Sequence, residues 1–334
     1  MKQYKVAVLG ATGAVGREMI KILEERNFPV SELIPLASAR SAGSTMTFRG
    51  QEITVREVTP DSFAGVDIVL GAAPNKLAQE YAPHIVAAGA VFVDNSSAFR
   101  MDKDVPLVVP EINPEDALKH KGIISNPNCS TIISLVAVNA INKISPIKTM
   151  TASTYQAVSG AGAGGVIELE EQTNAIVEGK SFEPSVFPYQ IAFNLIPQIG
   201  GFGDNGYTSE EMKMQNEGRK ILHLPELLVG CTCVRVPVYR SHSISITLYT
   251  ETPISPEEAK AAIASAAGCR LVDNPEAKEY PMPLDTSDQD LVYVGRIRKD
   301  IASENGLSLW CCGDQVRKGA ALNCIQIAEL VIKE

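Results

Sequence analysis

Cys129 is the residue of this sequence best suited to nucleophilic chemistry. It follows Asn126-Pro127-Asn128, which end a short apolar run, and it precedes the long apolar stretch Ser130–Lys143, which predicts a helix. A thiol at a helix N-terminus experiences the positive end of the helix dipole and unpaired N–H groups, and both favour the thiolate. Cysteine is also common in cores, but the polar flanks here are unlike a core. The other six cysteines lie in apolar contexts and are predicted to be structural.

His242 is a candidate for acid–base chemistry, because imidazole titrates near neutrality. It stands at a predicted turn, Arg240-Ser241-His242-Ser243. A lone histidine is more often structural than catalytic, so the residue type alone does not decide its role. The four histidines are scattered, and this spacing predicts no metal site; they are His84, His120, His223 and His242.

A glycine-rich turn, GATGAVG at Gly10–Gly16, lies between the predicted strand Tyr4–Leu9 and the predicted helix Gly16–Arg26. Glycines allow a tight turn and close approach of the backbone to a pyrophosphate, which then rests on the helix N-terminus. A simple tight turn remains the alternative. The strand–loop–helix context favours a dinucleotide site.

The end of the next predicted strand, Leu33–Ala37, bears on the choice of cofactor. NAD sites usually place an acid there for the ribose hydroxyls, whereas NADP sites supply positive charge for the 2′-phosphate. This sequence has Ser38-Ala39-Arg40-Ser41 and no acid. Arg40 alone is compatible with a solvated surface residue. Together with the missing acid it predicts NADP(H).

Short β-rich runs alternate with helical stretches through the first half of the chain, which predicts βαβ units and a doubly wound, mostly parallel sheet of the Rossmann type. The further predicted elements there are strands at Glu52–Val55, Ile68–Gly71, Val91–Asp94, Pro106–Val109 and Gly122–Ser125, and a helix at Lys76–Ala88.

After Cys129 the pattern changes to longer strands mixed with helices, which predicts an α+β domain with a largely antiparallel sheet. The predicted elements are a strand at Lys148–Val158, a glycine-rich loop SGAGAGG, a β-rich stretch at Leu228–Glu251, a helix starting at Ser255-Pro256, and one long helix at Gln315–Ile332 that follows a strand around Trp310. The predicted domains are residues 1–128 with 315–334, and residues 129–314.

Composition excludes several classes of protein. The chain has 334 residues, enough for two domains. Its formal net charge is −9 with dispersed basic residues, which argues against nucleic-acid binding. No apolar run reaches the roughly 18 residues of a membrane span, and the start does not resemble a signal peptide. Seven cysteines without zinc-site or disulfide-scaffold spacing predict a reduced, cytoplasmic protein.

The motifs together resemble the aspartate-semialdehyde dehydrogenase family. SNPNCSTI around Cys129 resembles the family's active-site segment, and GATGAVG resembles its nucleotide loop. The resemblance covers essentially the whole chain, with further motifs in the same order: SAFR, YQAVSGAG, SEEMKMQNEGRKI, RVPVYRSHS and DQVRKGAA. It implies NADPH-dependent reduction of L-4-aspartyl phosphate to L-aspartate 4-semialdehyde, in the biosynthesis of lysine through diaminopimelate, threonine and methionine. The family also implies a homodimer joined through the second domain.

The resemblance implies a role for individual residues. Cys129 would hold the acyl group as a thioester, His242 would be the acid–base residue, and Gln156 would orient the acyl group. Arg100 and Lys213 resemble the phosphate-binding pair, Arg235 the partner of the α-carboxylate, and Glu210 that of the ammonium group. Without the resemblance, Glu210 and Lys213 would be interpreted as an i,i+3 pair on a solvated helix.

The expected cofactor contacts lie in both halves of the chain. Ser159 and Gly160 resemble contacts at the nicotinamide end, although a flexible loop remains plausible for Gly162–Gly165. Gln315 stands where the family more usually has Asn, which weakens the expectation that it contacts the nicotinamide. The full set is Gly10, Thr12, Gly13, Ala14, Val15, Ser38, Arg40, Ser41, Ser159, Gly160 and Gln315.

Three alternatives have different signatures. N-acetyl-glutamyl-phosphate reductase performs the same chemistry on a similar fold, but SNPNCSTI and the EExK helix point away from it. Glyceraldehyde-phosphate dehydrogenase combines a thiol, a histidine and a nicotinamide, but its flanking motifs differ. A catalytically inactive homologue would be expected to lack Cys129, Gln156 or His242, and all three are present.

Overall fold

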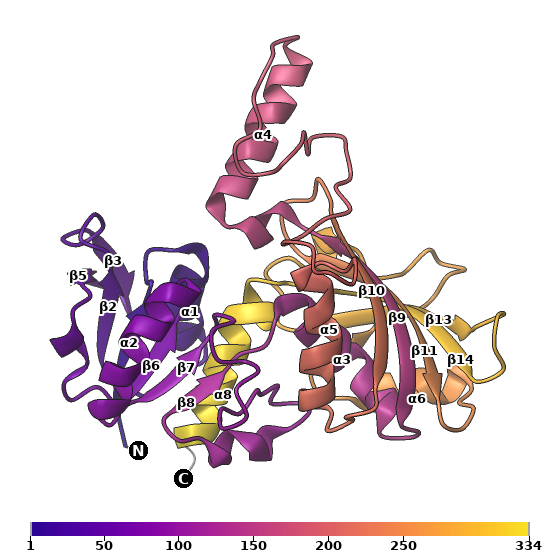
Figure 1. The fold of residues 1–334 in the computed structure, drawn as a ribbon, viewed down its shortest axis with the longest axis horizontal. Helices are drawn as coiled ribbons and strands as arrows, with labels where there is room; N and C mark the ends of the chain where they lie inside the picture. The colour runs from indigo at the N-terminus through magenta and orange to yellow at the C-terminus, as the bar shows by residue number, and fades with distance from the viewer. Residues whose placement is uncertain (1, 333–334) are drawn as a thin grey trace. The chain divides into compact units, whose positions relative to one another are not determined.

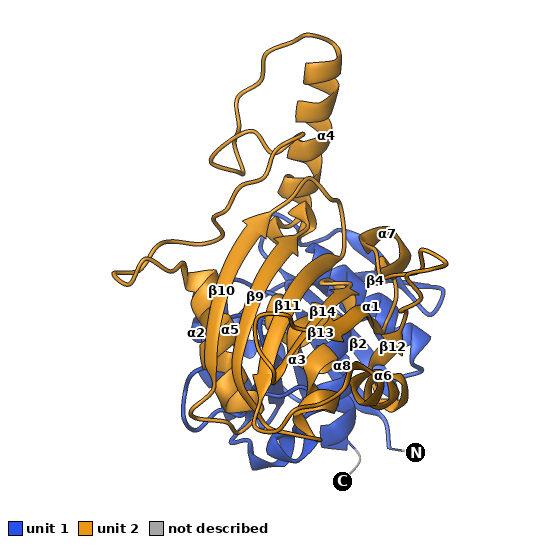
Figure 2. Ribbon diagram, turned by 90° about the vertical axis from the view of Figure 1, so that its right-hand side faces the viewer, with its two compact units in different colours: residues 1–128, 320–334 blue, residues 129–319 orange. Residues whose placement is uncertain are grey.

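The computed structural model describes residues 2–332 and divides the chain into two compact units. Unit 1 comprises residues 1–128 and 320–334, and unit 2 comprises residues 129–319 (Figure 2). The first division lies at the predicted domain boundary. The second falls at 319/320 rather than at the predicted 314/315.

Unit 1 is built on a six-stranded parallel sheet with strand order β5-β2-β1-β6-β7-β8. The strands are β1 (Tyr4–Leu9), β2 (Val30–Ala37), β5 (Arg56–Glu57), β6 (Ile68–Gly71), β7 (Val91–Asp94) and β8 (Ile123–Ser125). The main helices are α1 (Ala14–Glu25), α2 (Asn75–Ala87) and α8 (Leu322–Ile332).

Helices cover both faces of this sheet (Figure 1). Successive side chains of a strand point to opposite faces, and β1 shows the consequence. Val6 and Val8 belong to a hydrophobic cluster that contains α1 and α8, whereas Ala7 and Leu9 belong to another cluster that contains α2. The doubly wound parallel sheet expected from the sequence is confirmed.

Two predicted strands of unit 1 differ from the structure: one lies outside the main sheet, and the other does not form. Glu52–Val55 corresponds to β4 (Gln51–Thr54), which pairs with β3 (Thr45–Phe48) in a separate two-stranded hairpin rather than in the main sheet. Pro106–Val109 forms no strand, because Leu107 makes only an isolated bridge to Ser125. Proline lacks the N–H that would extend this ladder.

Unit 2 contains a second six-stranded sheet, in the order β10-β9-β11-β14-β13-β12. The strands are β9 (Ile147–Gln156), β10 (Leu228–Arg235), β11 (His242–Thr250), β12 (Cys269–Leu271), β13 (Val292–Lys299) and β14 (Gly306–Gly313). Three of the five pairings are antiparallel, so the sheet is mixed and mostly antiparallel, as expected. The helices that pack with it are α3 (Cys129–Asn142), α5 (Ser209–Ile221) and α6 (Pro256–Ser265).

The register of this sheet brings four strand ends together at one end of the sheet. In the parallel pair β9–β10, Gln156 lies opposite Arg235. The antiparallel strand β11 starts at this end, where His242 pairs with Gly313 of β14. The ends of β9 and β14 and the connection from β10 to β11, which are distant segments of the sequence, therefore meet where side chains of the predicted site are found.

An arm, residues 163–207, projects from the sheet of unit 2 (Figures 1 and 2). It consists of α4 (Ala163–Val177) and the loop that follows. Glu168 of α4 accepts hydrogen bonds from the backbone N–H groups of Ser185, Val186 and Phe187 at 2.9, 2.5 and 3.2 Å, which fixes the loop against the helix. Because α4 begins at Ala163, Gly164 and Gly165 are helical and do not form the flexible loop considered from the sequence.

The predicted long helix Gln315–Ile332 is interrupted at its start. The π-helical turn η4 (Arg317–Ala321) precedes α8, which begins only at Leu322. The Asp314 carboxylate accepts the N–H groups of Val316 and Arg317 at 2.8 and 3.0 Å, and Gly319 N–H bonds to the Asp314 carbonyl five residues earlier. These bonds replace the regular helical pattern. No helix within residues 2–332 combines the length and apolarity needed to cross a membrane.

Candidate active site

Cys129 is the first residue of α3, as the sequence indicates, and its Sγ lies 3.4 Å from Nε2 of His242. It is half-buried, whereas the six other cysteines are buried. The rest of α3 is almost entirely buried, which fixes the helix axis and hence the direction of its N-terminus. The geometry gives a partly accessible thiol at a helix N-terminus in contact with an imidazole.

His242 is fully buried at the start of β11. The preceding residue, Ser241, adopts a φ of +74°. Its N–H donates to the Gln315 side chain at 2.8 Å, and this bond fixes the turn that precedes His242. Burial and the positive charge of Arg235 lower the pKa of His242 to about 3, and Glu210 opposes them. Burial and the charge of Arg235 therefore both favour the neutral imidazole.

Gln156 lies at the end of β9, buried between two partners. Its Oε1 accepts the Thr154 hydroxyl at 3.0 Å, and its Nε2 donates to Glu210 at 3.2 Å. Glu210 in turn accepts Lys213 Nζ at 2.8 Å. The i,i+3 pair expected of a solvated helix does form, but Glu210 is buried rather than solvated.

Arg235 ends β10 as a buried cation. Its Nη1 donates to the Ala157 carbonyl at 2.6 Å, and its guanidinium lies 5.7 Å from the centre of the Phe187 ring on the arm. Burial lowers its pKa, and the negative charges of Cys129 and Glu210 oppose this effect. Positive and negative groups therefore lie within one electrostatic network around the thiol.

Ser159 and Gly160 lie on η3 (Val158–Ala161), next to the thiol–imidazole pair. A Cβ on Gly160 would lie 2.9 Å from Arg235 Nη1 and 3.3 Å from Cε1 of His242, so only glycine fits without displacing them. Ser159 donates to the Tyr239 carbonyl and accepts the side-chain amide of Gln315. The oxygen and the nitrogen of the Gln315 side-chain amide thus both form hydrogen bonds within the protein. Gln315 therefore connects η3 to the turn at Ser241.

The glycine-rich turn of unit 1 lies between β1 and α1. Gly10 has a φ of +86°, and a Cβ there would approach the Ala72 carbonyl oxygen to 2.5 Å. Gly13 is the N-cap of α1 and brings no side-chain cap, while Thr12, Ala14 and Val15 are at least partly exposed around it. The first-turn N–H groups are therefore accessible to an anion. These residues fit the pyrophosphate of a dinucleotide.

Ser38, Arg40 and Ser41 form the turn after β2. Ser38 and Arg40 are exposed, and Arg40 forms no ion pair with any residue between 2 and 332. No acid lies on this turn. The turn therefore offers an exposed guanidinium and two serine side chains.

Arg100 also belongs to unit 1 and is buried. Its Nε donates to the Ser96 carbonyl at 3.0 Å, and Nη2 donates to the Asn95 carbonyl at 2.9 Å. Burial raises the pKa of the nearby Asp94, whereas hydrogen bonds from Ser96 and the charge of Arg100 lower it. The guanidinium is held in place by backbone groups.

Sequence reasoning missed three residues that shape the site of unit 2. A Cβ on Gly319 would lie 2.9 Å from Cβ of Cys129, so the η4 turn can approach the thiol only without a side chain. Asp314 is fully buried and accepts Arg240 Nε at 2.6 Å. Ala157 contacts both Arg235 and His242 through its peptide groups. The motif DQVRKGAA contained the first two, but nothing in it indicates proximity to Cys129.

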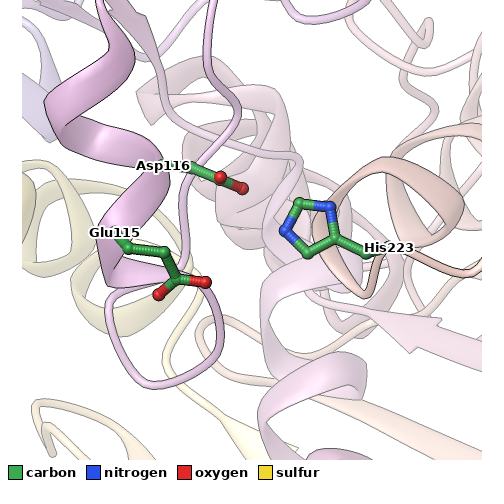
Figure 3. A group of neighbouring side chains, drawn as sticks. All are labelled: Glu115, Asp116 and His223. Atoms are coloured by element: carbon green, nitrogen blue, oxygen red, sulfur yellow. The ribbon is translucent and has the colours of Figure 1, made fainter.

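Glu115 and Asp116, shown in Figure 3, start η2 (Pro114–Lys119) of unit 1. The Asp116 carboxylate accepts Asn113 Nδ2 at 2.8 Å and Lys119 Nζ at 2.5 Å, so it takes part in a local structural network. His223, also shown there, lies just after α5 of unit 2 with a φ of +55°. None of the three is among the residues predicted for the site.

Comparison with known protein families covers most of the chain. Residues 5–120 match a family described as the NAD-binding domain of semialdehyde dehydrogenase, and residues 138–318 match its dimerisation domain. The chain is 53% identical to the aspartate-semialdehyde dehydrogenase of Aquifex aeolicus (strain VF5), over 99% of this chain and 98% of that protein.

Solved structures agree with these sequence matches. Aspartate semialdehyde dehydrogenase II from Vibrio cholerae, complexed with ASA, superimposes with a TM-score of 0.98 at 44% identity, over 100% of this chain and 99% of that chain. Aspartate semialdehyde dehydrogenase with NADP from Candida albicans superimposes with a TM-score of 0.77 at 27% identity, over 99% of both chains.

Proposed function

The chain belongs to the aspartate-semialdehyde dehydrogenase family, and on that premise we propose that it reduces L-4-aspartyl phosphate to L-aspartate 4-semialdehyde with NADPH and releases inorganic phosphate. The observation that carries this proposal is the contact of 3.4 Å between Cys129 Sγ and His242 Nε2 at the N-terminus of α3. The reaction serves amino-acid biosynthesis, leading to lysine, threonine and methionine. We place it in the cytoplasm.

Cys129 is the proposed nucleophile. Its thiolate is stabilised at the start of α3 by the helix dipole and by the positive charge of Arg235. Attack on the acyl phosphate forms a thioester and expels phosphate. When bound, NADPH supplies the hydride that reduces this thioester. Gln156 is proposed to orient the acyl group through its side-chain amide, and His242 to act as the acid–base residue towards the hemithioacetal oxygen.

The charged residues are proposed to recognise the substrate. Arg235 suits the α-carboxylate because a guanidinium binds a carboxylate through two parallel hydrogen bonds. Glu210 suits the ammonium group, since it is buried beside Gln156 and carries the negative charge of this network. Lys213 and Arg100 are the proposed phosphate ligands.

NADP is the proposed cofactor form. The exposed Arg40 and the absence of an acid on the turn after β2 support it over NAD. The contacts proposed for the cofactor are those of the glycine-rich turn, of Ser38, Arg40 and Ser41, and of Ser159, Gly160 and Gln315. We further propose that the protein is a homodimer, in keeping with the match of residues 138–318 to a dimerisation domain.

The test is reduction of NADP⁺ by aspartate semialdehyde with and without inorganic phosphate, followed by absorbance. The wild type is expected to require phosphate, and Cys129→Ala is expected to be inactive. Wild-type inactivity with this substrate would contradict the substrate assignment, and activity with N-acetyl-glutamate semialdehyde instead would establish the rival reductase. Phosphate-dependent activity that persists in Cys129→Ala would contradict the nucleophile.

A further inference from the structure

A chain of three side-chain amides runs through unit 1 from α8 to the carboxyl end of β7. Nδ2 of Asn323 donates to Oδ1 of Asn126 at 2.7 Å, and Nδ2 of Asn126 donates to Oδ1 of Asn95 at 2.8 Å. Asn323 and Asn126 are fully buried, and Asn95 is half-buried. The amide chain formed by these three residues therefore connects the C-terminal helix to the ends of two strands, β8 and β7.

The carbonyl of Val108 sets the direction of the amide chain. A backbone carbonyl only accepts hydrogen bonds, and this one accepts Nδ2 of Asn323 at 3.0 Å. A side-chain amide has one donor end and one acceptor end, so Asn323 presents its nitrogen to Asn126 as well. Asn126 must then turn its oxygen towards Asn323 and its nitrogen towards Asn95. Reversal of Asn126 alone would oppose two donors at one end and two acceptors at the other.

The orientation of Asn95 follows from this order. Its Oδ1 accepts Asn126, so its Nδ2 is the last donor of the amide chain. Within residues 2–332, Nδ2 of Asn95 donates to no acceptor, and the side chain is half-buried rather than enclosed. The amide chain therefore ends at a donor whose direction is fixed and whose acceptor is water or a ligand.

Asn95 is attached to two groups of the proposed reaction. Its carbonyl accepts Nη2 of Arg100 at 2.9 Å, so it holds the arginine proposed to bind phosphate. Its side chain bonds to Asn126, which lies three positions before Cys129 in the sequence. In an acyl phosphate, the phosphate is bonded to the carbon that the thiolate attacks. A donor attached both to Arg100 and to the segment of the nucleophile is therefore suited to the phosphate.

We infer, on the premise of the function proposed above, that Asn95 is a further phosphate-binding residue and that Asn323 is the positioning residue that fixes its donor. Nδ2–H of Asn95 donates to a phosphate oxygen, both in the acyl phosphate and in inorganic phosphate. The Val108 carbonyl acts through Asn323 and Asn126, and it determines that a donor rather than an acceptor faces the anion.

The first test measures the binding of inorganic phosphate to the full-length enzyme by ³¹P NMR, without cofactor or semialdehyde. Asn95→Asp keeps the oxygen that accepts Asn126 and replaces the donor with a second oxygen. We expect the Kd for phosphate to rise by about 10-fold or more, because a hydrogen bond to a charged group is lost. The control is Asn142→Asp at the end of α3, where Oδ1 of a half-buried asparagine accepts the Ile147 N–H at 3.0 Å. Equal Kd values in the two variants would overturn the role of Asn95.

The second test changes the other end of the amide chain. The carboxylate of Asn323→Asp only accepts, so Asn126 is expected to turn its nitrogen towards it and Asn95 to present an oxygen in place of its donor. The Kd for phosphate should then rise as in Asn95→Asp. The double variant should add no more than about 2-fold, since both residues act through one donor. Gln326→Ala, on the same helix, is the control and should bind phosphate as the wild type does.

Three results are decisive for this assignment. If Asn323→Asp lowers Tm but leaves the Kd for phosphate of the folded variant unchanged, its positioning role is overturned. A rise in KM for NADP⁺ with an unchanged Kd for phosphate in Asn95→Asp would assign the donor to the cofactor and overturn the phosphate contact. The binding readout needs no turnover, so a wild type that binds phosphate but reduces no NADP⁺ counts only against the proposed function.

Discussion

Arg235 shows how one residue sets both charge and geometry. It is buried, its guanidinium bonds to the Ala157 carbonyl, and its charge helps to keep His242 neutral. A buried cation is costly unless it is paired, and Glu210 supplies opposing charge, as does Cys129 when it is ionised. The same arginine is therefore proposed to favour the thiolate and to bind the carboxylate of the substrate.

Replacing Gly160 by alanine is expected to lower kcat by roughly 10-fold or more, because the new Cβ meets Arg235 and the His242 ring. Thermal stability should change little by comparison. The measurement is kcat and Tm for Gly160→Ala beside Gly164→Ala, whose Cβ would meet only Val186 on the arm, at 3.3 Å. Equal kcat values for the two variants would contradict the close packing of η3 on the site.

The buried His242 should make stability depend on pH. Its pKa is about 6.5 in the unfolded chain and about 3 in the folded protein, so the unfolded chain binds the proton first as the pH falls. The contribution of the buried, neutral imidazole to the free energy of unfolding is fully retained above about pH 6.5. It is lost as the pH falls towards 3, by up to about 1.4 kcal/mol for each pH unit. Urea unfolding at neutral pH and about pH 5, at one protein concentration, should show a smaller fall for His242→Gln than for the wild type. A parallel fall would contradict the depressed pKa.

Residues with side-chain chemistry could be predicted from the sequence, but those that act through the backbone could not. Cys129, Gln156 and His242 stand in recognisable motifs, and the structure brings them to one end of the unit 2 sheet. The peptide of Ala157 has no sequence signature. Gly319 lies 190 positions after Cys129, and their proximity depends on the complete fold of unit 2.

At the scale of elements, the arm is attached to the site through η3. A Cβ on Gly165 of α4 would lie 2.4 Å from the Val158 carbonyl oxygen, so helix and η3 are tightly packed. Phe187 of the arm lies over Arg235. Burial opposes ionisation of Glu168, but hydrogen bonds from residues 185–187 outweigh it and hold its pKa below the ordinary value. The arm is therefore organised around one buried carboxylate.

Glu168→Ala should loosen the arm, because four hydrogen bonds from residues 185–187 would lose their acceptor. We expect faster proteolysis within residues 178–207 and lower activity, since Phe187 packs on Arg235. Limited proteolysis with mass mapping is the measurement, and Glu170→Ala, which alters an exposed residue on the same helix, is the control. Identical cleavage rates in both variants would show that Glu168 does not hold the loop.

Element types were easier to predict than element ends. Apolar, β-branched runs indicated β1, β6 and β7 with the bounds that the structure shows. The C-terminal helix was predicted to start at Gln315, because helical periodicity does not reveal that Asp314 caps the following N–H groups and forms a π turn. The hairpin of β3 and β4 was missed for a similar reason, since a short strand says nothing about which sheet it joins.

At the scale of the whole molecule, the chain is divided between a unit with a dinucleotide-type sheet and a unit with the thiol, and α8 returns to the first unit. The packing of α8 with α1 and β1 in one cluster explains why the first unit is discontinuous in sequence. The glycine-rich turn and the turn after β2 belong to the first unit, so their residues can be altered without changing the unit that carries the thiol.

Arg40→Ala is expected to raise KM for NADP⁺ by about 10-fold or more and to leave activity with NAD⁺ nearly unchanged, because a hydrogen bond to a charged group contributes about 1.5–3 kcal/mol. Steady-state kinetics with both cofactors is the measurement. Arg56→Ala removes another exposed arginine of unit 1, which pairs with Glu32, and should leave the preference unchanged. Equal effects on NADP⁺ and NAD⁺ would contradict a 2′-phosphate contact.

The proposed reaction intermediate is an acyl thioester on Cys129. The enzyme is incubated with aspartate semialdehyde and NADP⁺ in the absence of phosphate, quenched in acid and digested, and each cysteine peptide is then weighed by mass spectrometry. We expect an aspartyl adduct on the peptide that contains Cys129, which disappears when phosphate is added before the quench. An adduct on another cysteine, or turnover with no adduct on any peptide, would contradict a thioester on Cys129.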